Sequence, residues 1–169
     1  EGLHVGLRYR LAEPDVVPHV LADLSLDPSQ TLVTIAAGVA TDLVGDETEA
    51  SVVRVMPNLA AETNDMAAAA TGAVTDEVRT LLEDVGEYVE IPEADMDVAT
   101  AVNGSGPAFV FYLIQAMRDA GVEAGLEPEQ AETLAAQTFK GAAETVLRSE
   151  QSIEDLIDAV CSPNGTTIE

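Results

Sequence analysis

The sequence has very few basic residues: seven Lys and Arg stand against 31 Asp and Glu, for a formal net charge of −24. A nucleic-acid-binding protein needs a basic surface, and no cluster of Lys and Arg occurs here, so nucleic acid is excluded as a partner. Long hydrophobic runs are missing as well. The longest apolar stretch, from Pro107 to Ile114, is far shorter than the roughly 18 residues of a membrane span, so no membrane partner is expected.

Cysteine is nearly absent: Cys161 is the only one, so no internal disulfide can form. This scarcity is typical of reducing compartments, and no secretory signal opens the chain, so we expect a cytoplasmic protein. His4 and His19 lie far from Cys161 and show no metal-ligand spacing. The sequence therefore predicts no metal site.

The acidic charge accompanies a hydrophobic share of 47%, which excludes a disordered acidic tail. The acidic residues are spread along the chain, which favours a solvated acidic surface over a cation-binding face. Lysine occurs once, at Lys140. Because molar salt shortens the Debye length to about 3 Å and so screens self-repulsion, this composition indicates a protein from a high-salt cell.

The first half of the chain alternates short apolar runs with helical spacings, which predicts an α/β sheet that is parallel in large part. No G-x-G-x-x-G motif occurs in it. Helices are expected over Asp15–Leu24 and from an N-cap at Thr75 to about Asp84. The expected strands are Leu3–Leu7, Thr31–Ala36, Ser51–Val55, Met66–Thr71 and Gly86–Ile91.

Strand signals end at Pro92, so we expect a Rossmann-like portion over residues 1–92 and a helical domain over 93–169. One helix should cover Ala94–Val102, and the sequence 103–107 should break it, with Ser105 as the next N-cap. The following helix is apolar around most of its circumference, which indicates a subunit interface. The last two predicted helices start at Pro128, running to about Leu147, and at a capping box of Ser152 and Asp155, running to Val160.

The strongest local motif is the terminal run Ser-Pro-Asn-Gly-Thr-Thr, residues 162–167. Its Pro and Asn-Gly predict a turn that exposes backbone N–H groups beside three hydroxyls. Such a loop suits a carboxylate or a phosphate. A plain surface turn would have the same composition, and the motif alone leaves both readings open.

Three weaker motifs lie at predicted element ends. Ile35–Val39 and Arg54–Asn58 end strands, where an α/β sheet forms its ligand cleft, although plain packing would produce them too. Asn103–Pro107 has a glycine pair that lets a ligand approach the backbone, or simply forms a corner between helices.

Taken together and in order, these motifs resemble the pyrroline-5-carboxylate reductase family. The resemblance covers nearly the whole chain and runs through these segments: 36–39, 54–58, 100–108, 119–122, 125–126, 141–143 and 162–167. It implies a Rossmann domain that binds NADPH or NADH and a helical domain that forms a homodimer or higher homo-oligomer. It also implies hydride transfer to 1-pyrroline-5-carboxylate, a cyclic imino acid, giving L-proline in the last step of proline synthesis.

The resemblance implies roles for individual residues. Thr167 would lie near the ring nitrogen as the catalytic residue. The other expected substrate-binding residues are Ser162, Asn164, Gly165, Thr166, Thr100 and Glu150. The expected cofactor-binding residues are Gly6, Leu7, Arg8, Ala36, Ala37, Asn58 and Pro107.

The sequence also departs from the family pattern. The phosphate-binding glycine motif and the helix after Thr167 are missing, so the chain is expected to be truncated at both ends and inactive by itself. Arg8-Tyr9 replaces Lys-Pro at the cofactor edge, and Asn164 replaces a glycine. Two alternatives stay open: a related NAD(P)H-dependent reductase of another imine or oxo acid, and a dimerisation module that has lost its chemistry.

Overall fold

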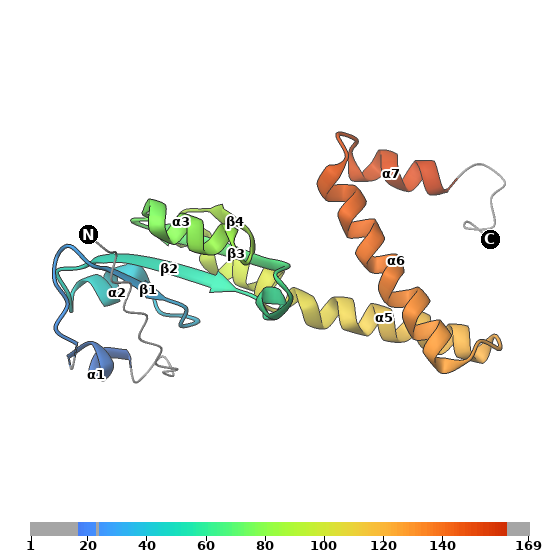
Figure 1. Cartoon of the computed structure of the whole chain (residues 1–169), viewed down its shortest axis with the longest axis horizontal. Helices are drawn as coiled ribbons and strands as arrows, with labels where there is room; N and C mark the ends of the chain where they lie inside the picture. The colour runs from blue at the N-terminus through green and yellow to red at the C-terminus, as the bar shows by residue number, and fades with distance from the viewer. Residues whose placement is uncertain (1–16, 23, 162–169) are drawn as a thin grey trace. The chain divides into compact units, whose positions relative to one another are not determined.

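The computed structural model describes residues 17–22 and 24–161 (Figure 1). The chain divides into two compact units, residues 1–107 and 108–169. The predicted strand Leu3–Leu7 lies outside the described residues. The predicted domain boundary at Pro92 stays a prediction. The first helical turns after Pro92 pack against β2 and β3 of the first unit.

The first unit is built on a four-stranded sheet with the order β1-β2-β3-β4. Its strands are β1 (Thr31–Thr34), β2 (Ser51–Pro57), β3 (Met66–Gly72) and β4 (Gly86–Glu90). Each lies where the sequence predicts a strand. β1 pairs with β2 and β3 with β4 in parallel, whereas β2 and β3 are antiparallel.

Two of the three strand pairs are parallel, in agreement with the predicted sheet that is parallel in large part, and the antiparallel pair β2–β3 makes it mixed. The reason is the short connection between β2 and β3, residues 58–65, which contains only the 3₁₀ helix η2 (Leu59–Thr63). A parallel crossover needs a dozen or more residues, so this segment can only turn the chain back. Asn64, at φ 58°, closes the turn in a left-handed conformation.

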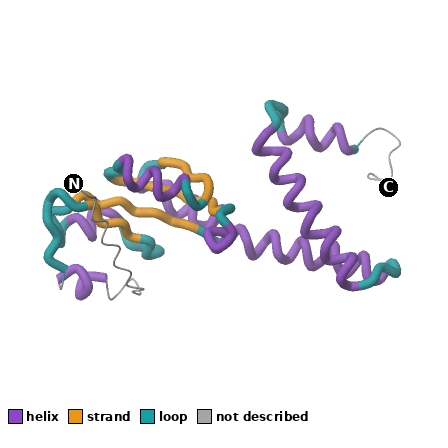
Figure 2. Tube along the Cα trace, viewed as in Figure 1, coloured by secondary structure: helices purple, strands orange, loops and turns teal. Residues whose placement is uncertain are grey.

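Helices cover both faces of this sheet (Figure 2). Helix α3 (Asp76–Glu83) starts at Thr75, whose hydroxyl accepts a hydrogen bond from the Val78 N–H at 3.4 Å, as the sequence predicted. Its buried side chains join one apolar cluster with β2 and β3: Val53, Val55, Met66, Ala68, Ala70, Val78 and Leu82. Helices α1 (Val17–Ala22) and α2 (Thr41–Gly45) contribute to a second cluster together with the loop before α2: Val17, Leu21, Val39 and Val44, with Leu32 and Val52 packed against it. Neighbouring residues of a strand point to opposite faces, so Val52 and Val53 belong to different clusters.

A nearly continuous helical segment follows Pro92. It consists of η3 (Glu93–Asp95), α4 (Met96–Ala99) and the π-helical turn η4 (Thr100–Gly104), and α5 (Gly106–Glu123) comes directly after it. The predicted boundary is present, since η4 ends at Gly104 and α5 begins at Gly106, but the predicted N-cap at Ser105 is wrong. Ser105 has helical dihedral angles, φ −86° and ψ −22°, and its N–H donates to the Thr100 carbonyl at 3.1 Å. A π turn of this kind is frequent at functional sites.

The second unit contains the rest of α5, α6 (Pro128–Arg148) and α7 (Ile153–Val160). The predicted starts are confirmed: Pro128 lies in the first turn of α6, and the Ser152 hydroxyl accepts a hydrogen bond from the Asp155 N–H at 3.1 Å. Among the described residues of this unit, only Ala131 and Ala135 are buried. Large apolar side chains are exposed instead: Phe109, Phe111, Tyr112, Leu113, Leu134, Leu147, Ile153, Ile157 and Val160. In residues 17–22 and 24–161, no helix combines the length and the apolar character that crossing a bilayer requires.

Candidate functional site

The loop after β1 presents a small apolar surface at the carboxyl end of the strand. The Thr34 hydroxyl accepts a hydrogen bond from the Ala36 N–H at 3.3 Å, and the Val39 N–H donates to the Ala36 carbonyl at 3.4 Å. Gly38 has φ +73°, and no heavy atom lies within 4 Å of where its Cβ would be. Glycine is therefore needed there for the backbone conformation, not for space. Ala36 is half-buried and Ala37 is exposed.

The end of β2 lies beside this loop, because Thr34 pairs with Arg54 in the parallel register. Asn58 follows β2 directly. Its Oδ1 accepts hydrogen bonds from the Ala60 N–H at 3.1 Å and from the Ala67 N–H at 3.2 Å. Asn58 thus caps η2 and holds the start of β3, and its expected contact with a cofactor stays a prediction.

Thr100 and Asn103 both lie in the π turn η4, which belongs to the first unit. The Thr100 hydroxyl donates to the Met96 carbonyl at 2.7 Å, and the Asn103 Nδ2 donates to the Met56 carbonyl at 2.7 Å and to the Ala67 carbonyl at 3.0 Å. Asn103 therefore ties the turn to the adjoining ends of β2 and β3. Pro107 is half-buried in the first turn of α5.

The remaining predicted site residues lie in the second unit or outside the described residues. Glu150 is exposed in the bend between α6 and α7, in the second unit. Eight others lie outside the described residues: Gly6, Leu7, Arg8, Ser162, Asn164, Gly165, Thr166 and Thr167. Their expected roles stay predictions. The first unit thus assembles Ala36, Ala37, Asn58, Thr100 and Pro107.

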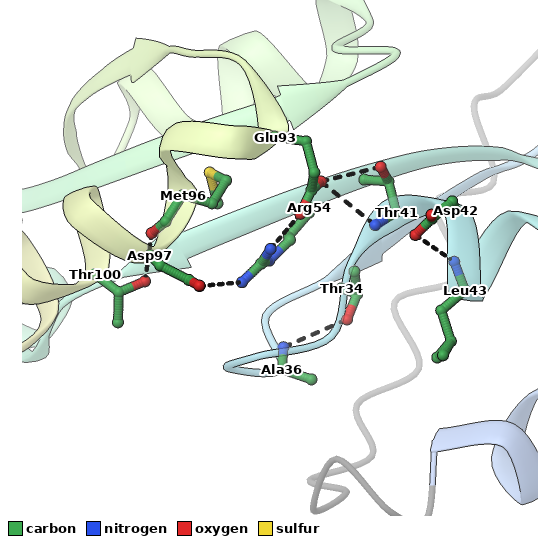
Figure 3. A network of polar contacts seen from close by, with 10 residues as sticks. All are labelled: Thr34, Ala36, Thr41, Asp42, Leu43, Arg54, Glu93, Met96, Asp97 and Thr100. Carbon is green, nitrogen blue, oxygen red and sulfur yellow. Dashed lines mark hydrogen bonds and ion pairs between the residues drawn. The ribbon is translucent and has the colours of Figure 1, made fainter.

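A buried ionic network that the sequence analysis missed lies on β2 (Figure 3). The Arg54 Nη1 forms an ion pair with the Glu93 Oε1, and its Nη2 lies 3.9 Å from the Asp97 Oδ1. The Glu93 Oε2 accepts hydrogen bonds from the Thr41 hydroxyl at 3.0 Å and from the Thr41 N–H at 3.3 Å. Arg54 is only 3% exposed. The sequence did contain a signal for this network: Arg54 is the single charged residue in the apolar run 52–56, and a buried arginine needs a charged or polar partner.

Metal ligands do not gather anywhere in the part of the chain that the structure describes: no three His, Cys, Asp or Glu side chains converge there.

Comparisons with known proteins agree with this architecture. Residues 93–169 match the family described as pyrroline-5-carboxylate reductase dimerisation. The pyrroline-5-carboxylate reductase of Methanosarcina acetivorans is 39% identical over 167 residues, which cover 93% of this chain and 62% of that protein. The chain therefore spans less than two thirds of this relative.

Two solved structures are similar over nearly the whole chain. The crystal structure of Plasmodium falciparum pyrroline carboxylate reductase, with NADP bound, has a TM-score of 0.78 and 32% identity, covering 94% of this chain and 67% of that one. The reductase structure from Coxiella burnetii has a TM-score of 0.82 and 30% identity, covering 94% and 63% of the two chains.

Sheet, helices and comparisons together define the class: the C-terminal part of a Rossmann-like domain followed by a helical dimerisation domain. The predicted fold class is confirmed. Within that class, the chain belongs to the pyrroline-5-carboxylate reductase family.

Proposed function

We propose that the full-length protein carrying this chain is a pyrroline-5-carboxylate reductase. It transfers a hydride from NADPH or NADH to the imine carbon of 1-pyrroline-5-carboxylate, the ring nitrogen takes up a proton from solvent, and L-proline and the oxidised nucleotide are released. The observation that carries the proposal is the similarity to reductases of this name over 93% of the chain, in sequence and in fold.

The loop of Ala36 and Ala37 fits the nicotinamide end of such a cofactor. Both side chains are small, Ala37 is exposed, and the space next to Gly38 is open, so a flat ring can approach the backbone. The similar structure from Plasmodium falciparum holds NADP. When bound, the nicotinamide supplies the hydride. Asn58 and Pro107, and Gly6 to Arg8 beyond the described residues, complete the cofactor site that we propose.

The substrate is held by its carboxylate. In this proposal the backbone N–H groups and hydroxyls of residues 162–167 bind that group, as such loops bind anions. The Thr167 hydroxyl hydrogen-bonds the ring nitrogen and so orients the imine carbon. Thr100 and Glu150 are the remaining substrate-binding residues of this proposal. The contribution of these residues is to position the imine, because hydride transfer requires a close and aligned approach.

A second copy of this chain is the proposed partner. Helix α5 exposes Phe109 at 62%, Phe111 at 57% and Tyr112 at 72%, and the described part of the unit buries no large side chain of its own. Apolar surface of this extent on a soluble unit marks an interaction site. Residues 93–169 match a dimerisation family, so we assign these helices to a homodimer or a larger homo-oligomer.

Charge and cysteine content suggest the conditions under which the protein works. We propose a cytoplasmic protein of a high-salt cell, supported by the net charge of −24 and by the single free thiol of Cys161. Screening at molar salt would relieve the self-repulsion of this charge.

The test is oxidation of NADPH and of NADH by the full-length protein with pyrroline-5-carboxylate, in about 0.1 M and about 3 M KCl. Imine-dependent oxidation that yields proline is the expected result. Turnover with another cyclic imine or an oxo acid, but not with this one, would replace the substrate. A folded oligomer that oxidises neither cofactor with any of these compounds would refute the proposal and favour a dimerisation module.

A further inference from the structure

Arg54 is buried more deeply than its hydrogen bonds explain. The side chain is 4% exposed, yet its Nε and Nη2 have no hydrogen-bond partner in the described part of the chain. Asp97, whose side chain is 91% exposed, lies 3.9 Å from Nη2, beyond hydrogen-bond distance. In the described part of the chain, the ion pair with Glu93 and the longer, solvent-exposed ion pair with Asp97 are what compensate the desolvation of the guanidinium. A buried ion pair of this kind is weak evidence for stability, and local violations of this sort are expected near functional sites.

Glu93 connects Arg54 to the loop after β1. Helix α2 has Ala40 at its N-cap, which offers no side-chain acceptor. The Glu93 carboxylate takes that place from 52 residues away, by accepting from both the N–H and the hydroxyl of Thr41. The loop 35–40 is therefore held at Thr34 by the backbone pairing of β1 with β2, and at Thr41 by the Glu93 carboxylate.

The same carboxylate fixes the segment that carries Thr100. Glu93 opens η3, and three residues later Met96 is fully buried against Met56 and Ala69. The Thr100 hydroxyl binds the Met96 carbonyl. Figure 3 shows Arg54 between these two segments, with Thr41 and Ala36 on one side and Asp97 and Thr100 on the other.

We propose that Arg54 is a positioning residue: acting through Glu93, it holds the loop of Ala36 and Ala37 at a fixed distance from Thr100. The proposal rests on the proposed function, in which that loop faces the cofactor and Thr100 faces the imine. Arg54 itself touches neither ligand. Its effect on the reaction is to keep the cofactor-binding loop and the segment of Thr100 at a constant distance from each other.

The first test replaces the members of the network one at a time in the full-length protein. Arg54→Met removes the charge at similar length, and Glu93→Gln keeps an acceptor for Thr41 but removes the ion pair. Thr41→Val removes only the hydroxyl contact. The matched control is Arg79→Met, which breaks the ion pair of Arg79 with Glu90 (2.8 Å, side chains 42% and 46% exposed) on α3 and β4.

Steady-state kinetics then separate positioning from plain stability. Arg54→Met should raise KM for both NADPH and the imine and lower kcat/KM by about 10- to 100-fold, since small misplacements in an active site have effects of this size. Thr41→Val should raise KM for the cofactor and leave KM for the imine unchanged, because it loosens only the loop side. Arg79→Met should change neither constant. The assays are run well below the Tm of each variant, so that unfolding does not contribute to the measured kinetic constants.

Hydrogen–deuterium exchange supplies a readout that needs no turnover. In Arg54→Met and Glu93→Gln, amides of residues 36–41 and of 96–100 should exchange faster together, whereas Arg79→Met should leave both segments unchanged. If Arg54→Met does not fold, Glu93→Gln carries the same test.

The outcomes distinguish the two proposals. Unchanged KM values in Arg54→Met and Glu93→Gln, or faster exchange in only one segment, overturn the positioning role while wild-type turnover upholds the reductase. Absence of turnover in the wild-type protein, with coupled exchange in both segments, refutes the reductase and retains the coupling by Arg54.

Discussion

The side chain of Met96 offers the sharpest test of how the first unit is held together. It is fully buried, in a small cluster with Met56 and Ala69 against which Ile91 and Ala99 pack. Met96→Ala would remove the side chain that fastens α4 to β2 and β3. Truncation of a buried methionine to alanine costs about 2–5 kcal/mol, through lost transfer free energy and the cavity left behind. Because Thr100 binds the Met96 carbonyl, the substitution should also loosen Thr100.

The assay is urea unfolding followed by circular dichroism, since the sequence has no tryptophan. Protein concentration is held constant, because subunit association contributes to the measured stability. Met96→Leu keeps the volume and should cost less than about 1.5 kcal/mol. Val98→Ala, on the same helix but 66% exposed, should lie within about 0.5 kcal/mol of the wild type. A free energy of unfolding for Met96→Ala within about 0.5 kcal/mol of wild type would refute the packing argument.

Three further substitutions and one change of conditions test other parts of the chain. Thr167→Ala should weaken transition-state binding by about 1–3 kcal/mol through loss of a buried hydrogen bond, measured as kcat/KM; unchanged kinetics would remove Thr167 from the site. Gly72→Ala should lower the free energy of unfolding by more than about 2 kcal/mol, because Gly72 has φ +97° and its Cβ would lie 2.3 Å from the Val52 carbonyl oxygen. Gly141→Ala, inside α6 with no atom within 4 Å of the new Cβ, should instead raise it by about 0.5–1 kcal/mol, and equal effects at the two glycines would contradict this reasoning. Finally, Tm should rise between about 0.1 M and about 3 M KCl as screening relieves the net charge of −24, and a flat Tm would rule out the high-salt interpretation.

Elements with local signals were predictable from the sequence. Thr75, Pro128 and Ser152 each mark a helix start through their own backbone or hydroxyl chemistry, and the structure places helix starts there. The direction of β3 was not predicted, although the short connection 58–65 leaves room only for an antiparallel return. Strand periodicity reports which residues are buried, and it says nothing of whether neighbours run parallel.

Within the candidate site, the strand-end residues were predictable and the network that supports them was not. Ala36, Ala37 and Asn58 follow apolar strands directly, so their place at the carboxyl ends of β1 and β2 follows from the pattern. Arg54 and Glu93 are 39 residues apart, and Glu93 and Thr41 are 52 apart. No periodicity connects such positions, because the pairing exists only once the sheet and η3 have packed together. The π turn at Thr100–Gly104 was not predicted, because the glycines at 104 and 106 indicate only that a helix is interrupted there.

The cap that Glu93 provides for α2 also sets an order of events during synthesis. Thr41 leaves the ribosome long before Glu93, so the first N–H of α2 has no side-chain acceptor while the strands around it are being made. Chains generally begin to fold from the N-terminus as they emerge. In this protein the contact of Glu93 with Thr41, next to the loop of Ala36 and Ala37, can form only after residue 93 has been made. Nascent chains that end before Glu93 should therefore contain the strands but lack a fixed loop between β1 and α2. Limited proteolysis should cut that loop faster in these chains than in chains that extend beyond Glu93.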